Sequence, residues 1–156
     1  MRVSICAVGR MKHGPERLMV EDYLDRFNKT GRALGLGPCD LHEVEDKRGG
    51  GMAAEAQLLR STTPKGASVI CLDERGKQLS SPDFAHLLAQ FRDQGQAPLA
   101  FVIGGADGID PVLRSEATQS ISFGAMVWPH MLARVMLTEQ LYRAATILAG
   151  GPYHRA

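Results

Sequence analysis

Short apolar runs alternate along the chain with longer segments in which apolar residues recur every three or four positions. The runs predict β-strands, because a strand buried on both faces has no polar side. They lie at residues 3–8, 40–44, 67–72, 99–103 and 119–123. The longer segments predict helices with one apolar face. They lie at residues 15–29, 53–60, 80–91 and 129–148, with a further short helix beginning at Asp110-Pro111. The first of them has its expected apolar face at Leu18, Met19, Tyr23 (or Asp22) and Phe27.

This order of strands and helices predicts an α/β fold, with a mostly parallel sheet and helices on both faces. Ligands in such sheets bind outside the carboxyl ends of the strands. Three loops of unusual composition leave predicted strands at that edge, after Leu72, after Ile103 and after Phe123. We expect these loops to converge on one site. No repeat, low-complexity tract or linker divides the chain, so residues 1–156 are expected to form one domain.

Composition and charge limit the classes of protein to which this chain can belong. No apolar run approaches the roughly 20 residues needed to cross a bilayer, so no membrane partner is expected. The three cysteines are widely spaced in apolar contexts, which indicates buried reduced thiols and a cytoplasmic location. A net charge of +1 is low for a general nucleic-acid binder. Basic runs at residues 10–13 and 47–48 can still form a local patch, although such runs are more often simply solvated.

Two of the three loops have the composition of a ligand pocket. The first, Gly104-Gly105-Ala106-Asp107-Gly108, follows a strand, and its glycines allow close approach of the backbone to a ligand. A pocket wall and a tight turn both fit this spacing, whereas a Rossmann fingerprint needs an early G-x-G-x-x-G. The second loop, residues 124–129, is uncharged and contains Trp128-Pro129. It can either hold an adenine ring or pack around a buried tryptophan.

The final predicted helix is apolar on nearly all sides, which is typical of a helix buried in a core or between subunits. We therefore expect a homodimer that covers the excess apolar surface. Four polar residues form one stripe at i+4 spacing: His130, Arg134, Thr138 and Tyr142. Capping and structural pairing are the ordinary roles for the first two. Arg143 lies four residues after Glu139, so it is either an ion-pair partner or part of an anion-binding surface.

The last residues combine three kinds of chemistry after a break in the helix. Gly150-Gly151-Pro152 ends the helix, and Tyr153, His154 and Arg155 follow. An aromatic ring, a group that titrates near neutrality and a fixed positive charge predict half of an active site. Asp73-Glu74-Arg75 is interpreted as a polar strand end and not as a catalytic cluster. The sequence contains no serine triad order, no metal-ligand spacing and no Walker loop, and no metal is expected.

Several segments together resemble one family. They are FVIGGADG at residues 101–108, WPHMLARVMLTEQLYRA at residues 128–144 and the terminal PYHR, supported by VSICAVGRMK, DYLDRFNK and ICLDERGKQLSS. In order and spacing they resemble the RlmH family, which belongs to the SPOUT superfamily. The resemblance covers nearly the whole chain. It implies a SPOUT-type fold with a C-terminal trefoil knot, and S-adenosylmethionine as the methyl donor. The implied activity is methylation of N3 of a pseudouridine in the 23S rRNA of the large ribosomal subunit.

The resemblance also assigns roles to residues of this chain. It implies a cofactor-binding set of Leu72, Gly104, Gly105, Gly124, Ala125, Met126, Val127, Trp128 and Pro129. It implies a catalytic set of Tyr153, His154 and Arg155 at the tail, and Arg143 is added for its charge and its distance from the tail. We expect His154 to be the right type of base for the acceptor N–H.

One departure from the family keeps a second function open. Members often have Ser-Lys-Met where this chain has Gly124-Ala125-Met126, so any polar contact made by that Ser or Lys is missing. A non-catalytic ribosome- or RNA-binding protein that retains the fold is therefore the alternative. A nucleotide-binding oxidoreductase is a third class, and the missing early glycine fingerprint argues against it.

Overall fold

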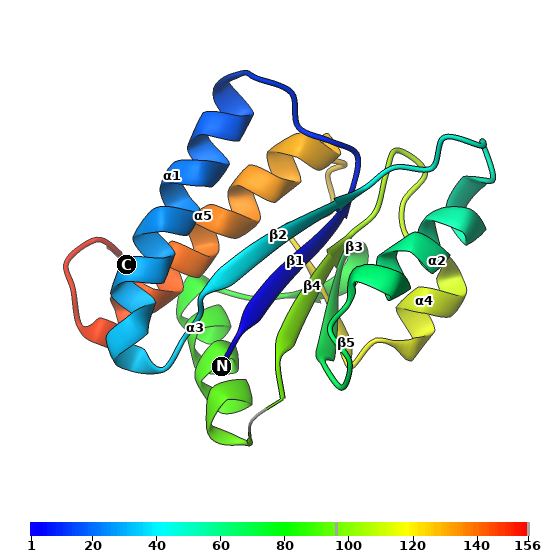
Figure 1. Cartoon of the computed structure of the whole chain (residues 1–156). Helices are drawn as coiled ribbons and strands as arrows, with labels where there is room; N and C mark the ends of the chain where they lie inside the picture. The colour runs from blue at the N-terminus through cyan, green and yellow to red at the C-terminus, as the bar shows by residue number, and fades with distance from the viewer. Residues whose placement is uncertain (96, 156) are drawn as a thin grey trace.

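A computed structural model describes residues 1–95 and 97–155 and contains one five-stranded sheet (Figure 1). The strands are β1 (Val3–Val8), β2 (Cys39–Val44), β3 (Ser68–Gln78), β4 (Leu99–Ile103) and β5 (Gln119–Ser122). They lie in the order β2-β1-β4-β3-β5, and every pairing is parallel. The predicted α/β class with a parallel sheet is confirmed.

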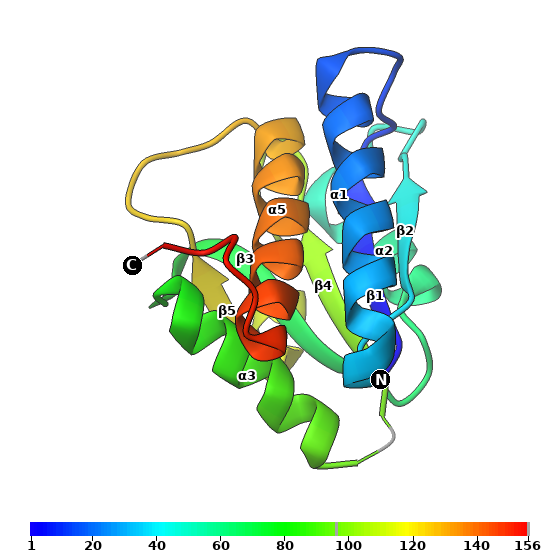
Figure 2. The ribbon, with the colours of Figure 1, turned by 90° about the vertical axis from the view of Figure 1, so that its left-hand side faces the viewer.

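Helices cover both faces of the sheet (Figures 1 and 2). They are α1 (Pro15–Gly31), α2 (Gly51–Thr62), α3 (Ser81–Asp93), α4 (Pro111–Glu116) and α5 (His130–Ala149), with a 3-10 turn η1 at Arg32–Leu34. Helices α1, α3 and α5 pack on one face, in a core that includes Phe27, Phe101 and Leu137. Helices α2 and α4 pack on the other face, in a second core that includes Leu59 and Leu113. The central strands β1 and β4 are buried along their whole length, which explains their uninterrupted apolar sequences.

Local sequence signals account for several helix ends. The hydroxyl of Ser80 accepts a hydrogen bond from the Asp83 amide at the start of α3, and Asp110 caps α4 through the Val112 amide. Helix α5 ends at Gly150, which has a left-handed backbone with a φ of 75°. That conformation reverses the chain direction, so the residues that follow can return along the helix.

Strand β3 continues further than the predicted strand, through Asp73-Glu74-Arg75 to Gln78. Its pairing with β5 shifts register between Leu72 and Lys77. A Cβ at Gly76 would lie 2.6 Å from the backbone of β5, so only glycine fits where the two strands approach. The prediction that strand structure ends at Leu72 was therefore wrong, because tertiary pairing carries a polar segment into the sheet.

The prediction of which residues form the apolar face of α1 was also wrong in part. Leu18 and Met19 are 64% and 44% exposed, whereas Val20 and Phe27 are buried. Both sets have helical spacing, and the sequence alone does not distinguish which of them packs on the sheet.

Helix α5 does not expose the excess of apolar surface that its sequence suggested. Val135, Leu137 and Leu141 are buried against the rest of the chain, and only Leu132 among its large apolar side chains is clearly exposed. In its polar stripe, Arg134 and Thr138 are completely buried. The helix is thus the central element of a helical layer between α1 and α3, as Figure 2 shows.

Among the described residues, no helix combines the length and apolar character that crossing a membrane requires. Cys6, Cys39 and Cys71 are free and buried, as predicted. Burial raises the pKa of each thiol, for Cys71 to about 11, so the thiolate form is disfavoured. The trefoil knot stays a prediction of the resemblance.

Candidate functional site

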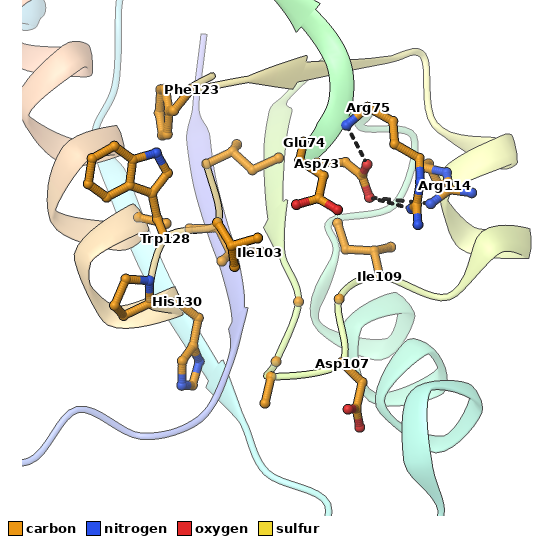
Figure 3. A pocket seen from close by; sticks show the side chains of 18 of the residues that line it. Asp73, Glu74, Arg75, Ile103, Asp107, Ile109, Arg114, Phe123, Trp128 and His130 are labelled. Carbon is orange, nitrogen blue, oxygen red and sulfur yellow. Dashed lines mark hydrogen bonds and ion pairs between the residues drawn. The ribbon is translucent and has the colours of Figure 1, made fainter. Parts of the chain in front are cut away.

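A cavity of about 750 Å³ opens at the carboxyl edge of the sheet (Figure 3). Residues 72–75, which belong to β3, line it together with the loops after β4 and β5, so the three segments converge as the topology predicted. The first residues of α2 and α5 complete its wall through Met52 and His130. A mixed apolar and polar lining on this scale suits a nucleotide-sized ligand.

The structure brings together nearly all the residues that were expected to bind a cofactor. Those that line the cavity are Leu72, Gly104, Gly105, Gly124, Met126, Val127, Trp128 and Pro129. Ala125 does not line it in the described part of the chain. The departure from the family pattern at position 125 therefore falls on a residue outside the cavity lining.

The loop from Gly124 to Pro129 presents apolar side chains that are exposed in the described part of the chain. Met126, Val127 and Trp128 are 74%, 82% and 42% exposed. Gly124 begins the loop with a φ of 119°, a conformation that favours glycine. The Ser122 hydroxyl fixes this turn, since it accepts from the Gly124 amide at 3.0 Å and donates to the Gly124 carbonyl at 2.9 Å. Trp128 is therefore not buried, as the alternative required, and exposed apolar surface of this kind suits contact with a ligand or partner.

The glycines after β4 make a tight turn against the protein itself. The Gly108 amide donates to the Gly105 carbonyl, and a Cβ at Gly104 would lie 2.6 Å from the Gly108 backbone. A Cβ at Gly105 would meet Glu55 and Val8 at 3.1 Å, and neither of these lines the cavity. The turn thus requires glycine for its own packing while its backbone forms a wall of the cavity.

The cavity wall opposite the Trp128 loop holds a structural ion-pair cluster (Figure 3). The Asp73 carboxylate is only 6% exposed and lies 3.3 Å from Arg114 and 3.6 Å from Arg75. It also accepts a hydrogen bond from the Arg75 amide at 2.9 Å. The carboxylate of Asp73 is therefore engaged in structural contacts, in agreement with the interpretation of this segment as non-catalytic.

Arg134 is a buried link between α5 and the strands at the edge of the cavity. Its Nη1 donates to Glu43 at 2.7 Å, and its Nη2 donates to the carbonyls of Val8 at 3.2 Å and Gly9 at 3.1 Å. Glu43 also accepts from the Met11 amide at 2.6 Å. Burial lowers the pKa of Arg134, and the Glu43 carboxylate opposes that effect. One side chain therefore joins α5 to the ends of β1 and β2.

His130 adds a second contact at the same place. Its Nδ1 lies 3.3 Å from the Val8 carbonyl, and it also lines the cavity (Figure 3). Together with Arg134 it fixes the first turn of α5, which directly follows the Gly124–Pro129 loop. The structural pairing considered for both residues is confirmed, whereas capping is not, because the start of α5 has no side-chain cap hydrogen bond.

The tail folds back along α5, so that three of the four residues expected to be catalytic lie close together. The Tyr153 hydroxyl donates to Glu139 at 3.0 Å, and Arg143 contacts the same carboxylate oxygen at 2.6 and 2.9 Å. A further Arg143 nitrogen lies 3.2 Å from His154 Nδ1. Burial, followed by the bond to Glu139, raises the pKa of Tyr153 to about 12. Tyr153 therefore keeps its proton at neutral pH, and Arg155 is exposed.

The tail cluster and the cavity are separate in the described protomer, since Arg143, Tyr153, His154 and Arg155 do not line the cavity. An apolar groove of about 260 Å³ lies between them, formed by Met19, Tyr23, Phe123, Val135, Met136, Glu139 and Gln140. Phe123 lines both the groove and the cavity, whereas Glu139 lines the groove and anchors the tail. The groove thus connects the two parts of the predicted site.

Sequence reasoning missed several residues of this region. Glu139 was considered only as a partner of Arg143, and its spacing gave no sign that the tail returns to it. Met52 and Phe123 enter the cavity walls through tertiary packing, which no local motif signals. The hydrogen bonds of Ser122 could have been suspected, because Ser before a glycine often fixes a turn.

Comparisons with known proteins agree with this architecture. Residues 1–154 match the family described as Predicted SPOUT methyltransferase. The chain is 70% identical over 155 residues to Ribosomal RNA large subunit methyltransferase H of Ruegeria pomeroyi, which covers 99% of both chains. Proteins with the same name from Ruegeria sp. (strain TM1040) and Dinoroseobacter shibae are 66% and 64% identical, also over 99% of each chain.

The buried ion pair of Arg134 with Glu43 predicts that a substitution of Arg134 strongly lowers the stability of the fold. Replacing Arg134 with Met leaves Glu43 without its cation, and we expect the free energy of unfolding to fall by about 3 kcal/mol, as for other broken buried pairs. Urea denaturation followed by circular dichroism measures this. Arg2→Met is the control, because it breaks an ion pair with Asp40 whose side chains are 65% and 46% exposed, and it should cost less than about 1 kcal/mol. Equal effects of the two changes would contradict the role assigned to Arg134.

Proposed function

Since the chain belongs to the SPOUT methyltransferase family, we propose that it methylates N3 of a pseudouridine in bacterial 23S rRNA, with S-adenosylmethionine as the donor. Relatives that match over nearly their full length are named large-subunit rRNA methyltransferases. The observation that carries the proposal is the cavity at the carboxyl edge, with its uncovered apolar loop. A substrate in the bacterial ribosome would place the protein in the cytoplasm.

The residues of the cavity fit the proposed donor. Met126, Val127 and Trp128 offer apolar surface for an adenine ring, and the backbone of the Gly104–Gly108 turn offers amides and carbonyls. Bound S-adenosylmethionine supplies a methyl group on a sulfonium, whose sulfur leaves as a neutral thioether when the methyl bonds to nitrogen. No metal is needed for this chemistry.

The departure from Ser-Lys to Gly124-Ala125 does not remove the pocket. Gly124 is held by Ser122, and Ala125 lies outside the cavity lining in the described residues. This supports a catalytic protein over the alternative, a non-catalytic ribosome-binding protein that has lost donor binding.

The tail residues are proposed to act on the acceptor base. Pseudouridine N3 carries a hydrogen that must leave before or during methyl transfer. The positive charge of Arg155 can stabilise the resulting imide anion, and the ring of Tyr153 can stack on the base. Arg143 holds the tail in place and contributes a second positive charge. Positioning of the acceptor can supply roughly 7–11 kcal/mol of the barrier reduction.

The protein is further proposed to act as a homodimer, through α5 as the sequence suggested but with α1 contributing to the contact. Leu18 and Met19 on α1 and Leu132 on α5 are exposed, and Met19 lines the groove together with residues of α5. A two-fold symmetric contact uses the same patch on both copies. A second copy on this patch would cover the groove and bring the two cavities and two tails close together.

Deleting residues 153–156 should separate donor binding from catalysis (Ala156 lies outside the described residues). The donor should bind with a Kd unchanged within about threefold by calorimetry, because the tail does not line the cavity. Methyl transfer to isolated large subunits should fall by about 10² to 10⁴.

The reciprocal variant is Gly124→Val. A branched residue at a φ of 119° should distort the loop and weaken donor binding more than about tenfold. If the truncated protein methylates normally, the tail has no part in the mechanism. If the wild type binds no donor, the non-catalytic alternative holds.

The proposed dimer predicts that Met19→Asp gives monomers in light scattering, because a charge would enter the apolar contact. Val112→Asp is the control, since Val112 is 57% exposed on α4, on the opposite face of the sheet. Leu141→Asp is unsuitable as a test, because Leu141 is fully buried and its replacement would unfold the chain. A dimer that survives Met19→Asp would place the interface elsewhere.

A further inference from the structure

Glu139 accepts four hydrogen bonds and is the anchor of the tail. Its Oε1 accepts Nε and Nη2 of Arg143 and the hydroxyl of Tyr153, at 2.9, 2.6 and 3.0 Å. Its Oε2 accepts the side-chain amide of Gln140 at 3.0 Å. The carboxylate therefore fixes the guanidinium plane of Arg143 and the ring of Tyr153 at the same time.

The orientation of Arg143 determines which atom of His154 is free. A guanidinium has only N–H donors and no acceptor. At 3.2 Å from Arg143 Nη1, His154 Nδ1 must therefore accept, so it carries no proton. A neutral imidazole with an unprotonated Nδ1 carries its hydrogen on Nε2. His154 then presents an N–H group to its surroundings and has no free basic nitrogen.

We propose that Glu139 is a positioning residue that, through Arg143, fixes His154 as a hydrogen-bond donor to the acceptor base. This rests on the proposed function, and it changes the expected role of His154 from a base to a donor. The N3 proton of the acceptor passes to water, and the Nε2–H of His154 hydrogen-bonds a carbonyl oxygen of the resulting imide anion. The N3 lone pair then forms the bond to the methyl carbon, and the electrons of the broken C–S bond remain on sulfur.

The other groups around His154 are consistent with this role. Tyr153 holds its proton because its pKa is raised, and Arg143 and Arg155 are permanently charged donors. Helix α1 contributes Tyr23 and Arg26, which lie against the rings of Tyr153 and Tyr142. Among the described charged groups beside the tail, the cations Arg26, Arg143 and Arg155 outnumber the anions, which are Glu139 with its own donors and Asp22 at 3.1 Å from Arg26. These positive charges stabilise an anionic acceptor base, and they disfavour a neighbouring side chain that would take up a proton.

Two substitutions of His154 distinguish a donor from a base. His154→Gln keeps an N–H near the position of Nε2 but has no basic nitrogen, whereas His154→Leu has neither. If His154 is a donor, the glutamine variant should keep at least about a tenth of the wild-type single-turnover rate, and the leucine variant should lose about a hundredfold. Equal losses in both variants would show that His154 acts as a base and would overturn the proposal.

The role of Glu139 is tested without RNA or donor. Long-range ¹⁵N–¹H spectra report which imidazole nitrogen carries the hydrogen, and wild-type His154 should show a protonated Nε2 and a bare Nδ1. Glu139→Ala should give a mixture of tautomers, and Glu139→Gln, which retains an acceptor, should restore most of the wild-type pattern. Glu21→Ala is the matched control, because it removes a Glu–Arg pair of the same four-residue spacing that lies within α1.

The outcomes separate the inference from the proposed function. A wild-type His154 protonated on Nδ1, or a Glu139→Ala spectrum identical to wild type, would overturn the inference whatever the protein methylates. If wild-type His154 shows the expected tautomer but the protein methylates no rRNA, the proposed function is refuted and the inference about the tautomer is not.

Discussion

The buried contact of Arg134 with Glu43 is the constraint on which the rest of the site depends. A guanidinium with no exposed surface is tolerated only where anions and carbonyls surround it. Glu43 and the carbonyls of Val8 and Gly9 provide these partners, and they lie at the carboxyl ends of β2 and β1. The contact therefore sets the position of α5 relative to the sheet. The Gly124–Pro129 loop and the tail are attached to the two ends of α5, so the same contact also sets their positions.

Helix α5 divides the proposed chemistry into two parts. Its 20 residues span about 30 Å. The Gly124–Pro129 loop enters at its first turn and forms a wall of the cavity, and the tail leaves at its last turn and folds back to Glu139. The groove between them contains Phe123 on the cavity side and Glu139 on the tail side. A rigid helix thus holds the surface proposed for the donor and the groups proposed for the acceptor at a fixed separation.

The sequence predicted the strands, their parallel arrangement and the cavity loops, because these follow from periodicity and from the geometry of α/β sheets. It could not show that the polar stripe of α5 faces inward, since helical spacing gives a face and not its direction. For the same reason Leu18 and Met19 were assigned to the core in place of Val20. The tail contacts were also beyond prediction, because the return to Glu139 depends on the left-handed Gly150 and on tertiary packing with Tyr142.

The central claim is that this chain methylates one pseudouridine of the large subunit. It is tested most directly with large subunits from a strain that lacks the protein, incubated with the purified protein and isotope-labelled S-adenosylmethionine. Mass spectrometry of nuclease fragments of the 23S rRNA then locates any labelled methyl group. The account predicts one labelled methyl group on one pseudouridine, at N3. A labelled methyl on another nucleotide, or none in the presence of a bound donor, would contradict it.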